Sequence, residues 1–193
     1  MFGDPIANPL KWKMVPLSDL AEIRIGPFGS LLHREDYVSG YHALVNPSHI
    51  TESGLCIDTD LSVSDDKYAE LAAYHLELGD VVLGRRGEMG RCAVVCETGL
   101  LCGTGSMIIR PNKKMQSYFL QKIISYPTYR KKIEDMSVGV TMMNLNVPIV
   151  SRFQIPLLPI KKKTQYIQIV KSIDKSKFEI QQSRLKLKKK KKA

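Results

Sequence analysis

The sequence predicts an α+β fold, in which a domain of mixed sheet and small helices is followed by one long C-terminal helix. The domain is predicted by a hydrophobic content of 44% in 193 residues, and by short apolar runs that glycine and proline interrupt. The helix is predicted by residues 164–193, which contain no proline. We therefore divide the chain into a linker-like, turn-rich N-terminal segment (1–12), a domain (13–160) and a basic helix (161–193).

The first half of the domain alternates extended segments with turns. Residues 18–23 predict a short helix or the start of a strand, and residues 41–45 predict a strand that ends at Asn46-Pro47. Residues 50–57 indicate an irregular segment or a hairpin. Residues 65–74 predict a helix.

The second half of the domain contains the more apolar runs. Residues 81–83 and 92–96 are rich in β-branched side chains and predict strands on either side of a glycine-rich turn. Residues 99–102 and 106–110 predict a further pair that extends the same sheet until Pro111 ends it.

From Met115 onward the apolar period becomes that of a helix. Pro127 divides this segment into two helices, because proline breaks a helix interior but fits the first turn of a new helix. The apolar residues at helical spacing are Phe119, Ile123, Tyr126, Ile133 and Met136.

The C-terminal segment has apolar residues at a seven-residue interval, which is typical of helices that pair with each other. Lys177 and Arg184 interrupt this stripe, so a solvated helix with one face on its own domain remains an alternative. The residues expected at a helix pairing interface are Tyr166, Val170, Ile173, Ile180 and Leu187.

The formal net charge of +10 is distributed unevenly. Residues 161–193 carry +11, whereas residues 1–160 carry −1. Within the domain and the segment before it, residues 1–80 carry −8 and residues 81–160 carry +7. A basic half can lie against a phosphate backbone, so the charge favours a nucleic acid as the partner.

Signatures of catalysis and of metal binding are missing from the sequence. The four cysteines lack the C-x-x-C spacing of a zinc site, and the four histidines are scattered. No serine or cysteine lies in a G-x-S-x-G elbow, and the glycines of residues 84–90 lack the spacing of a nucleotide-binding loop. We therefore predict no catalytic residue, no metal and no directly bound cofactor.

The cysteines and the apolar runs also indicate the compartment. We expect the cysteines to be small core residues, because a disulfide scaffold is unusual in a cytoplasmic chain of this length. No apolar run approaches the roughly 18 residues that a membrane span requires. We therefore expect a cytoplasmic protein that does not insert into a membrane.

The turn at residues 84–91 is the strongest local candidate for a binding site. It presents three arginines, Arg85, Arg86 and Arg91, among three glycines. Guanidinium groups on such a turn could contact guanine edges bidentately or hold phosphates. A surface hairpin with incidental charge remains the alternative.

Several short motifs follow one another in a specific order along nearly the whole chain. They are Gly26-Pro27-Phe28-Gly29-Ser30, Gly79-Asp80-Val81-Val82 with Gly84-Arg85-Arg86-Gly87 and Gly90, Tyr118-Phe119-Leu120 with Tyr129-Arg130, Gly139-Val140-Thr141, Asn144-Leu145-Asn146, and Ile155-Pro156-Leu157-Leu158-Pro159-Ile160 with Gln165. In this order the chain resembles the DNA-specificity subunits of type I restriction–modification systems. Leu158, in place of the usual proline, and the basic residues before Gln165 depart from the family pattern.

The resemblance implies a target-recognition domain followed by a spacer helix. Subunits of this family usually have two such domains joined by two long antiparallel helices, and each domain reads half of a split DNA site. This chain is similar to half of such a subunit. We therefore expect this chain to be a non-catalytic subunit of a complex that is both a restriction endonuclease and an adenine methyltransferase. We also expect two copies of the chain to form a homodimer through their C-terminal helices.

The family also implies partners and DNA-contacting residues. The partners are double-stranded DNA, the modification subunits and, through them, the restriction subunit. These partner subunits would use S-adenosylmethionine, ATP and Mg, while this chain binds none of them directly. The residues expected to contact DNA are Ser30, His33, Arg34, Arg85, Arg86, Arg91, Lys113 and Lys114.

Two alternatives to this function remain open. The chain could be an inactive, truncated product of a rearranged specificity gene. It could also be a polybasic protein whose lysine-rich tail binds RNA or an anionic membrane surface. Deletion of residues 186–193 separates the last alternative from DNA recognition. If the polybasic alternative is right, the tail carries all nucleic-acid binding, and the deletion abolishes it.

Overall fold

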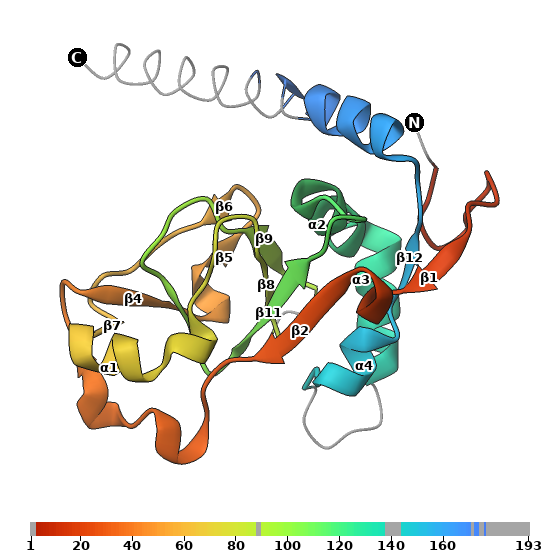
Figure 1. Cartoon of the computed structure of the whole chain (residues 1–193). Helices are drawn as coiled ribbons and strands as arrows, with labels where there is room; N and C mark the ends of the chain where they lie inside the picture. The colour runs from red at the N-terminus through yellow and green to blue at the C-terminus, as the bar shows by residue number, and fades with distance from the viewer. Residues whose placement is uncertain (1–2, 88–89, 138–143, 171, 174–175, 177–193) are drawn as a thin grey trace, which may run out of the picture. The chain divides into compact units, whose positions relative to one another are not determined.

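The computed structural model describes residues 3–87, 90–137, 144–170, 172–173 and 176 (Figure 1). The chain divides between Leu157 and Leu158 into two compact units. The strands and helices named below belong to the first unit, and the C-terminal helical segment belongs to the second. The boundaries predicted at residues 12 and 160 stay predictions.

The described part of the first unit contains twelve short strands and nine helical segments. The strands are β1 (Met14–Pro16), β2 (Ala21–Ile25), β3 (Tyr37–Val38), β4 (His42–Val45), β5 (Ile50–Thr51), β6 (Gly54–Leu55), β7 (Ser62–Val63), β8 (Val81–Gly84), β9 (Cys92–Val94), β10 (Leu101–Cys102), β11 (Ser106–Pro111) and β12 (Gln154–Pro156). The α-helices are α1 (Asp65–Glu70), α2 (Ser117–Ile124), α3 (Pro127–Ser137) and α4 (Val147–Ser151). Short 3-10 turns are η1 (Leu17–Asp19), η2 (Gly29–Leu31), η3 (Arg34–Asp36), η4 (Pro47–His49) and η5 (Ala72–Tyr74).

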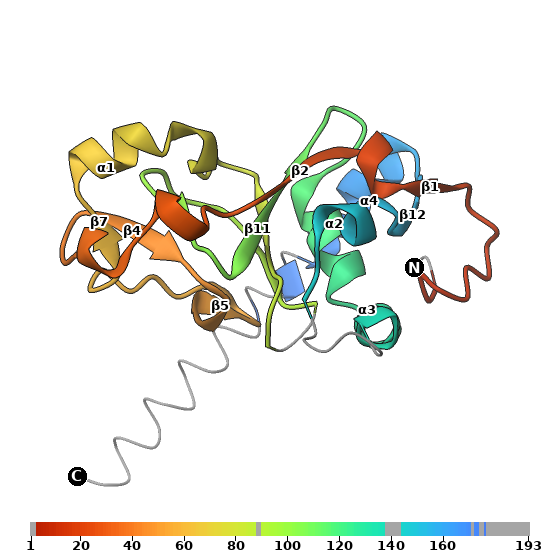
Figure 2. The same cartoon turned by 90° about the horizontal axis from the view of Figure 1, so that it is seen from below.

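A four-stranded antiparallel sheet of order β2-β11-β8-β9 lies in the middle of the first unit. Figures 1 and 2 show β4, β7 and α1 on one side of it and α2, α3 and α4 on the other. Every residue of β8 and β9 is buried. Because both faces of these strands are covered, their sequences are continuous apolar runs and do not alternate with polar residues.

The second four-stranded sheet has the order β10-β4-β7-β3. Its pair β10 and β4 is parallel, whereas the other pairs are antiparallel, so the predicted mixed sheet is confirmed. The prediction that residues 99–102 extend the central sheet is wrong, because β10 pairs with β4 in this second sheet. An apolar run predicts a buried strand but does not specify which strand lies beside it, since the pairing depends on the path of the chain through Gly103.

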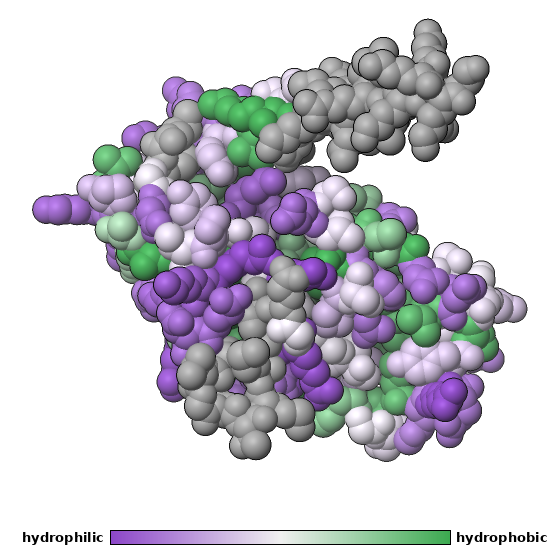
Figure 3. Space-filling model, turned by 180° about the vertical axis from the view of Figure 1, so that it is seen from behind, coloured by the Kyte–Doolittle hydropathy of each residue, from purple (hydrophilic) through white to green (hydrophobic). Residues whose placement is uncertain are grey.

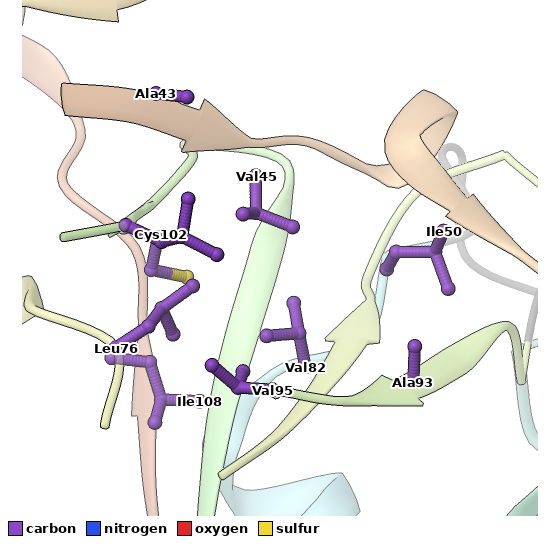
Figure 4. Close-up of a cluster of buried hydrophobic side chains, with 10 residues drawn as sticks. Ala43, Val45, Ile50, Leu76, Val82, Ala93, Val95, Cys102 and Ile108 are labelled. Atoms are coloured by element: carbon purple, nitrogen blue, oxygen red, sulfur yellow. The ribbon is translucent and has the colours of Figure 1, made fainter. Parts of the chain in front are cut away.

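The two sheets enclose an apolar core, which Figure 4 shows in close-up. Alternate residues of β4 point to opposite faces, so that Ala43 and Val45 lie in this core while Leu44 lies in a second cluster. The core between the sheets contains Ala43, Val45, Ile50, Leu76, Val82, Ala93, Val95, Leu100, Cys102 and Ile108. The second cluster contains Leu32, Leu44, Val63, Leu71 and Leu101, with Tyr68 of α1 packed against it.

Most predicted segments have the expected structure. The helix α3 begins at Pro127, as its proline predicts. Residues 50–57 contain the antiparallel pair of β5 and β6. The single helix predicted over residues 65–74 is instead α1 followed by η5, with Leu71 outside the helical backbone region between them.

The ends of the first unit meet in a two-stranded antiparallel sheet of β1 and β12. Tyr129 of α3 is buried beside this pair and donates a hydrogen bond of 3.1 Å to the backbone oxygen of Gln154. Its ring lies edge-on to Phe153, with 5.9 Å between the ring centroids. The exit from the first unit is therefore held by a strand pair and by a buried tyrosine.

In the second unit, residues 160–170 are helical. The helix begins directly after Pro159, whose carbonyl oxygen accepts hydrogen bonds from the amides of Lys162 and Lys163. Of the helix predicted over residues 161–193, the structure describes residues 161–170, 172–173 and 176. Ile180 and Leu187 lie outside the described residues. None of the described helices combines the length and the hydrophobicity needed to cross a bilayer.

Candidate nucleic-acid interface

The register of the central sheet places two predicted binding segments at the same end of it. In the antiparallel ladder Gly84 at the end of β8 lies opposite Ser106, and Ile25 at the end of β2 lies opposite Met107. Residues 26–34 and residues 85–91 therefore both leave the sheet at this end. We call it the glycine end.

Glycines allow backbone segments to approach one another closely at this end. A Cβ at Gly26 would overlap the backbone oxygen of Gly103, and a Cβ at Gly103 would overlap the side chain of Asn46. A Cβ at Gly105 would lie 2.9 Å from Pro47 Cδ. These positions require glycine because a side chain would displace the neighbouring segments.

Arg85 is the first residue after β8 and is only 8% exposed. Its Nε donates hydrogen bonds to Asn144 Oδ1 at 3.1 Å and to the backbone oxygen of Leu145 at 3.2 Å. Its backbone amide donates to Gly105, and its backbone oxygen accepts from Leu145, both at 3.0 Å. The backbone of Arg85 is thus held by Gly105 and by Leu145, and its side chain is held by Asn144 and Leu145.

The electrostatic environment of Arg85 is unfavourable to its charge. Burial lowers the pKa of its guanidinium, and the positive charge of Arg86 lowers it further. Among the residues that the structure describes, no carboxylate forms an ion pair with Arg85. This site therefore concentrates positive charge.

The other two arginines of the turn are more accessible. Arg86 is exposed and Arg91 is half-buried. Gly90 has a φ of 75° and packs against α3, since a Cβ there would lie 2.9 Å from Arg130 Cγ. The turn therefore lies directly beside Arg130 of α3.

The second segment leads from the glycine end towards α1, where Leu32 packs with Leu71 and Asp36 forms an ion pair of 3.6 Å with Lys67. Its residues Ser30, His33 and Arg34 are exposed. Ser30 lies in η2, and Arg34 begins η3. The carboxylate of Asp36 accepts a hydrogen bond of 2.6 Å from the backbone amide of His33, and this bond lowers the pKa of Asp36. It fixes the turn that presents His33 and Arg34.

Lys113 and Lys114 lie at the opposite end of the central sheet. They follow β11, whose last residue Pro111 lies opposite Ala21 at the start of β2. Both lysines are exposed. The structure thus places Arg85, Arg86 and Arg91 at the glycine end, Ser30, His33 and Arg34 in a segment that leads on to α1, and the two lysines at the opposite end. Whether any of the eight contacts DNA stays a prediction.

Asn144 and Arg130 also lie at the glycine end, but neither was predicted from the sequence as a DNA-contacting residue. Asn144 lies 59 positions from Arg85 in the sequence, so no local pattern could show their hydrogen bond. Arg130 is one of a run of three basic residues, and this run was a detectable signal. Its place beside the turn, however, depends on the packing of Gly90.

The cysteines and the metal-ligating residues suggest no other chemistry. In the described part of the chain, no three or more histidine, cysteine or acidic side chains gather as a metal site would require. Cys92 and Cys102 are buried, as expected, and burial raises the pKa of the Cys92 thiol to about 12. Cys56 and Cys96 are exposed, so the expectation of core positions is wrong for these two.

The surface seen in Figure 3 is mainly hydrophilic, with hydrophobic residues in small separate patches. Scattered apolar residues of this kind are normal on proteins in contact with water. On this face, polar side chains predominate.

Comparisons with known proteins identify the family. A family model described as "Type I restriction modification DNA specificity domain" matches residues 9–189. A solved chain from a study of complex assembly and conformational transition of the type I R-M system has a TM-score of 0.65, with 16% sequence identity over 87% of this chain and 39% of that chain. The HsdS subunit from Thermoanaerobacter tengcongensis has a TM-score of 0.58, with 17% identity over 87% of this chain and 38% of that subunit.

A third solved structure agrees with these two. The S subunit of a type I restriction–modification system from M. genitalium has a TM-score of 0.53, with 16% identity over 76% of this chain and 34% of that subunit. The chain thus spans less than two-fifths of the length of these subunits. The match of residues 9–189 confirms the resemblance drawn from the sequence motifs: this chain belongs to the type I restriction modification DNA specificity domain family.

Proposed function

We propose that this chain is the sequence-specific DNA-recognition subunit of a type I restriction–modification system and reads one half of a split target. The match of the family model over residues 9–189 carries the proposal. The basic turn at the glycine end supports it, because Arg86 is exposed there and Arg130 lies beside Gly90.

The proposed DNA interface consists of the turn at residues 85–91 and the segment at residues 26–34. Both leave the central sheet at the glycine end, and the proposal requires one duplex to extend from the turn to the segment that leads on to α1. The contact residues are Ser30, His33, Arg34, Arg85, Arg86 and Arg91. Lys113 and Lys114 would contact DNA only if the duplex also reached the opposite end of the sheet.

The proposed subunit performs no chemistry itself. It would orient modification subunits, which supply S-adenosylmethionine, and through them a restriction subunit that uses ATP and Mg. The catalytic steps of methylation and cleavage would then lie in the partners. The role of this chain would be to select the DNA sequence on which they act.

We further propose that two copies pair through their C-terminal helices. Ile169 and Ile173, one helical turn apart, are 44% and 48% exposed, and Tyr166 and Val170 are half-buried. These residues form an apolar stripe that a second helix could cover. The expected contacts of Ile180 and Leu187 would continue this stripe. Two identical domains related by a two-fold axis would recognise a palindromic, interrupted target.

The recognition function is tested by mapping methylated adenines in a host that carries this chain with its modification subunits. We expect methylation in one interrupted palindrome, and a lower extent of methylation at the same sites when Arg86 is replaced by alanine. Methylation that is independent of sequence would contradict the proposal. An absence of methylation with a folded chain would favour the inactive, truncated product.

Two further measurements test the pairing and the role of the tail. Sedimentation at several concentrations should show a dimer, and Ile169→Lys with Ile173→Lys should give a monomer of unchanged fold. A monomer in the wild type, even with the modification subunit present, would refute pairing. Loss of all nucleic-acid binding on deletion of residues 186–193 would favour the polybasic RNA or membrane-surface protein instead.

A further inference from the structure

Arg85 is a nearly buried cation whose hydrogen-bond partners among the described residues are neutral. Its Nε is bound by the amide oxygen of Asn144 and by the backbone oxygen of Leu145. Its two terminal nitrogens, which carry four of its five N–H groups, donate no hydrogen bond to the described residues. The side chain is therefore held in one orientation while most of its donors stay available.

Another arginine of the same sheet shows how the protein compensates a partly buried charge. Arg110 binds Asp80 through two hydrogen bonds of 2.9 Å and forms an ion pair of 2.7 Å with Glu77. Arg85 is more deeply buried than Arg110, yet it forms no ion pair with a described residue, and the like charge of Arg86 lowers its pKa. Since an isolated buried charge is costly, an anion from outside would stabilise this arrangement.

We propose that Arg85 and Arg86 form a phosphate site, in which a phosphodiester group of the DNA backbone binds the terminal nitrogens of Arg85 and is completed by the exposed Arg86. The proposal rests on the proposed DNA-binding function and assigns a role within it. A guanidinium is suited to this ligand, because its planar fork binds two phosphate oxygens at once. Arg85 would fix the position of the duplex, and neighbouring side chains would read its bases.

The burial of Arg85 favours a phosphate over a base edge. The major groove is about 8.5 Å deep, so a side chain that reads base edges must extend well beyond the protein surface. Arg85 is 8% exposed and is held by Asn144 and Leu145, so it cannot extend in this way. Phosphates lie on the outside of the duplex, where a guanidinium level with the protein surface can reach them.

The anion site is tested first without DNA, on the full chain. Thermal unfolding is followed as inorganic phosphate replaces chloride at constant ionic strength. We expect a saturable rise in the unfolding temperature of the wild type, because a ligand that binds only the folded state stabilises it. Arg85→Gln should weaken the apparent phosphate affinity at least ten-fold.

Two further variants control this experiment. Arg24→Gln removes an arginine that is already paired with Glu22 and should respond to phosphate as the wild type does. Arg86→Gln changes an exposed residue, so it should fold even if Arg85→Gln does not, and it should also weaken phosphate binding. An undiminished phosphate response in a folded Arg85→Gln or Arg86→Gln variant would overturn the proposal.

The phosphodiester assignment is then tested with a duplex of random sequence at several salt concentrations. Loss of one phosphate contact should reduce the slope of log K against log salt by about 0.9 in Arg85→Gln, with the base preference selected from a randomised library unchanged. An unchanged slope, or a changed base preference, would overturn the assignment. Phosphate binding at Arg85 without any DNA binding by the wild type would support the anion site and refute the proposed DNA recognition.

Discussion

The two ends of the central sheet are stabilised in different ways. At the glycine end, backbone segments meet at Gly26, Gly103 and Gly105, and Arg85 is bound by neutral acceptors. At the opposite end, Arg110 is bound by Asp80 and Glu77. We call this the ion-pair end. The ion-pair end neutralises its own arginine, whereas the glycine end holds an arginine without a described counter-ion, which suits it to an external anion.

The largest loss of stability is expected at the ion-pair end. Asp80 is 1% exposed and binds Arg110 and the backbone amide of Glu77. Asp80→Ala should lower the free energy of unfolding by about 3 kcal/mol, because it removes both hydrogen bonds of the partly buried Arg110 to Asp80. Urea unfolding measures this loss. Glu77→Gln, which changes an exposed partner, should cost less than about 1 kcal/mol, and equal losses would contradict the contrast between them.

A smaller loss is expected at the glycine end. In Gly103→Ala the added Cβ would overlap Asn46, so that backbone segments must move, at a cost of about 2 kcal/mol in urea unfolding. Gly29→Ala is the control, because its Cβ would meet no atom within 4 Å. Its left-handed φ of 63° should cost only about 1 kcal/mol. If Gly103→Ala lowers the free energy of unfolding no more than Gly29→Ala does, close backbone packing is not the reason for glycine at the glycine end.

Two serines provide a more sensitive comparison of the ends. Ser106 at the glycine end has a buried Oγ without a hydrogen-bond partner among the described residues. Ser106→Ala should therefore leave stability unchanged or raise it by up to about 1 kcal/mol. Ser117 near the ion-pair end donates a hydrogen bond to the backbone oxygen of Gly79, so Ser117→Ala should lower stability by about 1 kcal/mol. A rise in melting temperature for Ser106→Ala and a fall for Ser117→Ala would confirm the contrast between the two ends.

The smallest effect is a pH dependence in the turn at residues 33–36. The amide of His33 lowers the pKa of Asp36 below its usual value of 3.8. Because the folded-state pKa is depressed, the carboxylate stabilises the fold above pH 3.8, and this stabilisation is lost as the pH falls through the depressed pKa. Unfolding measured from pH 6 down to about pH 2 should show a steeper decline for the wild type than for Asp36→Asn. Parallel curves would show that this turn does not depend on the charge of Asp36.

The sequence predicted the positions of the strands and helices better than it predicted which strands pair with each other. Apolar runs located β8, β9 and β11, and Pro127 located the start of α3, because burial periodicity and the geometry of proline act within a few residues. The pairing of β10 with β4 was not predicted, since it joins segments more than fifty residues apart.

By itself, the sequence determined that a basic, glycine-rich turn follows a buried strand and that the chain has the motifs of its family. It could not distinguish Arg85 from Arg86, two adjacent residues of the same type in the same turn. Only the tertiary structure separated them, because Asn144 and Leu145, far along the chain, bind one guanidinium and leave the other exposed. The physical reason is that burial and hydrogen bonding depend on contacts between distant segments, whereas charge and local conformation depend on neighbouring residues.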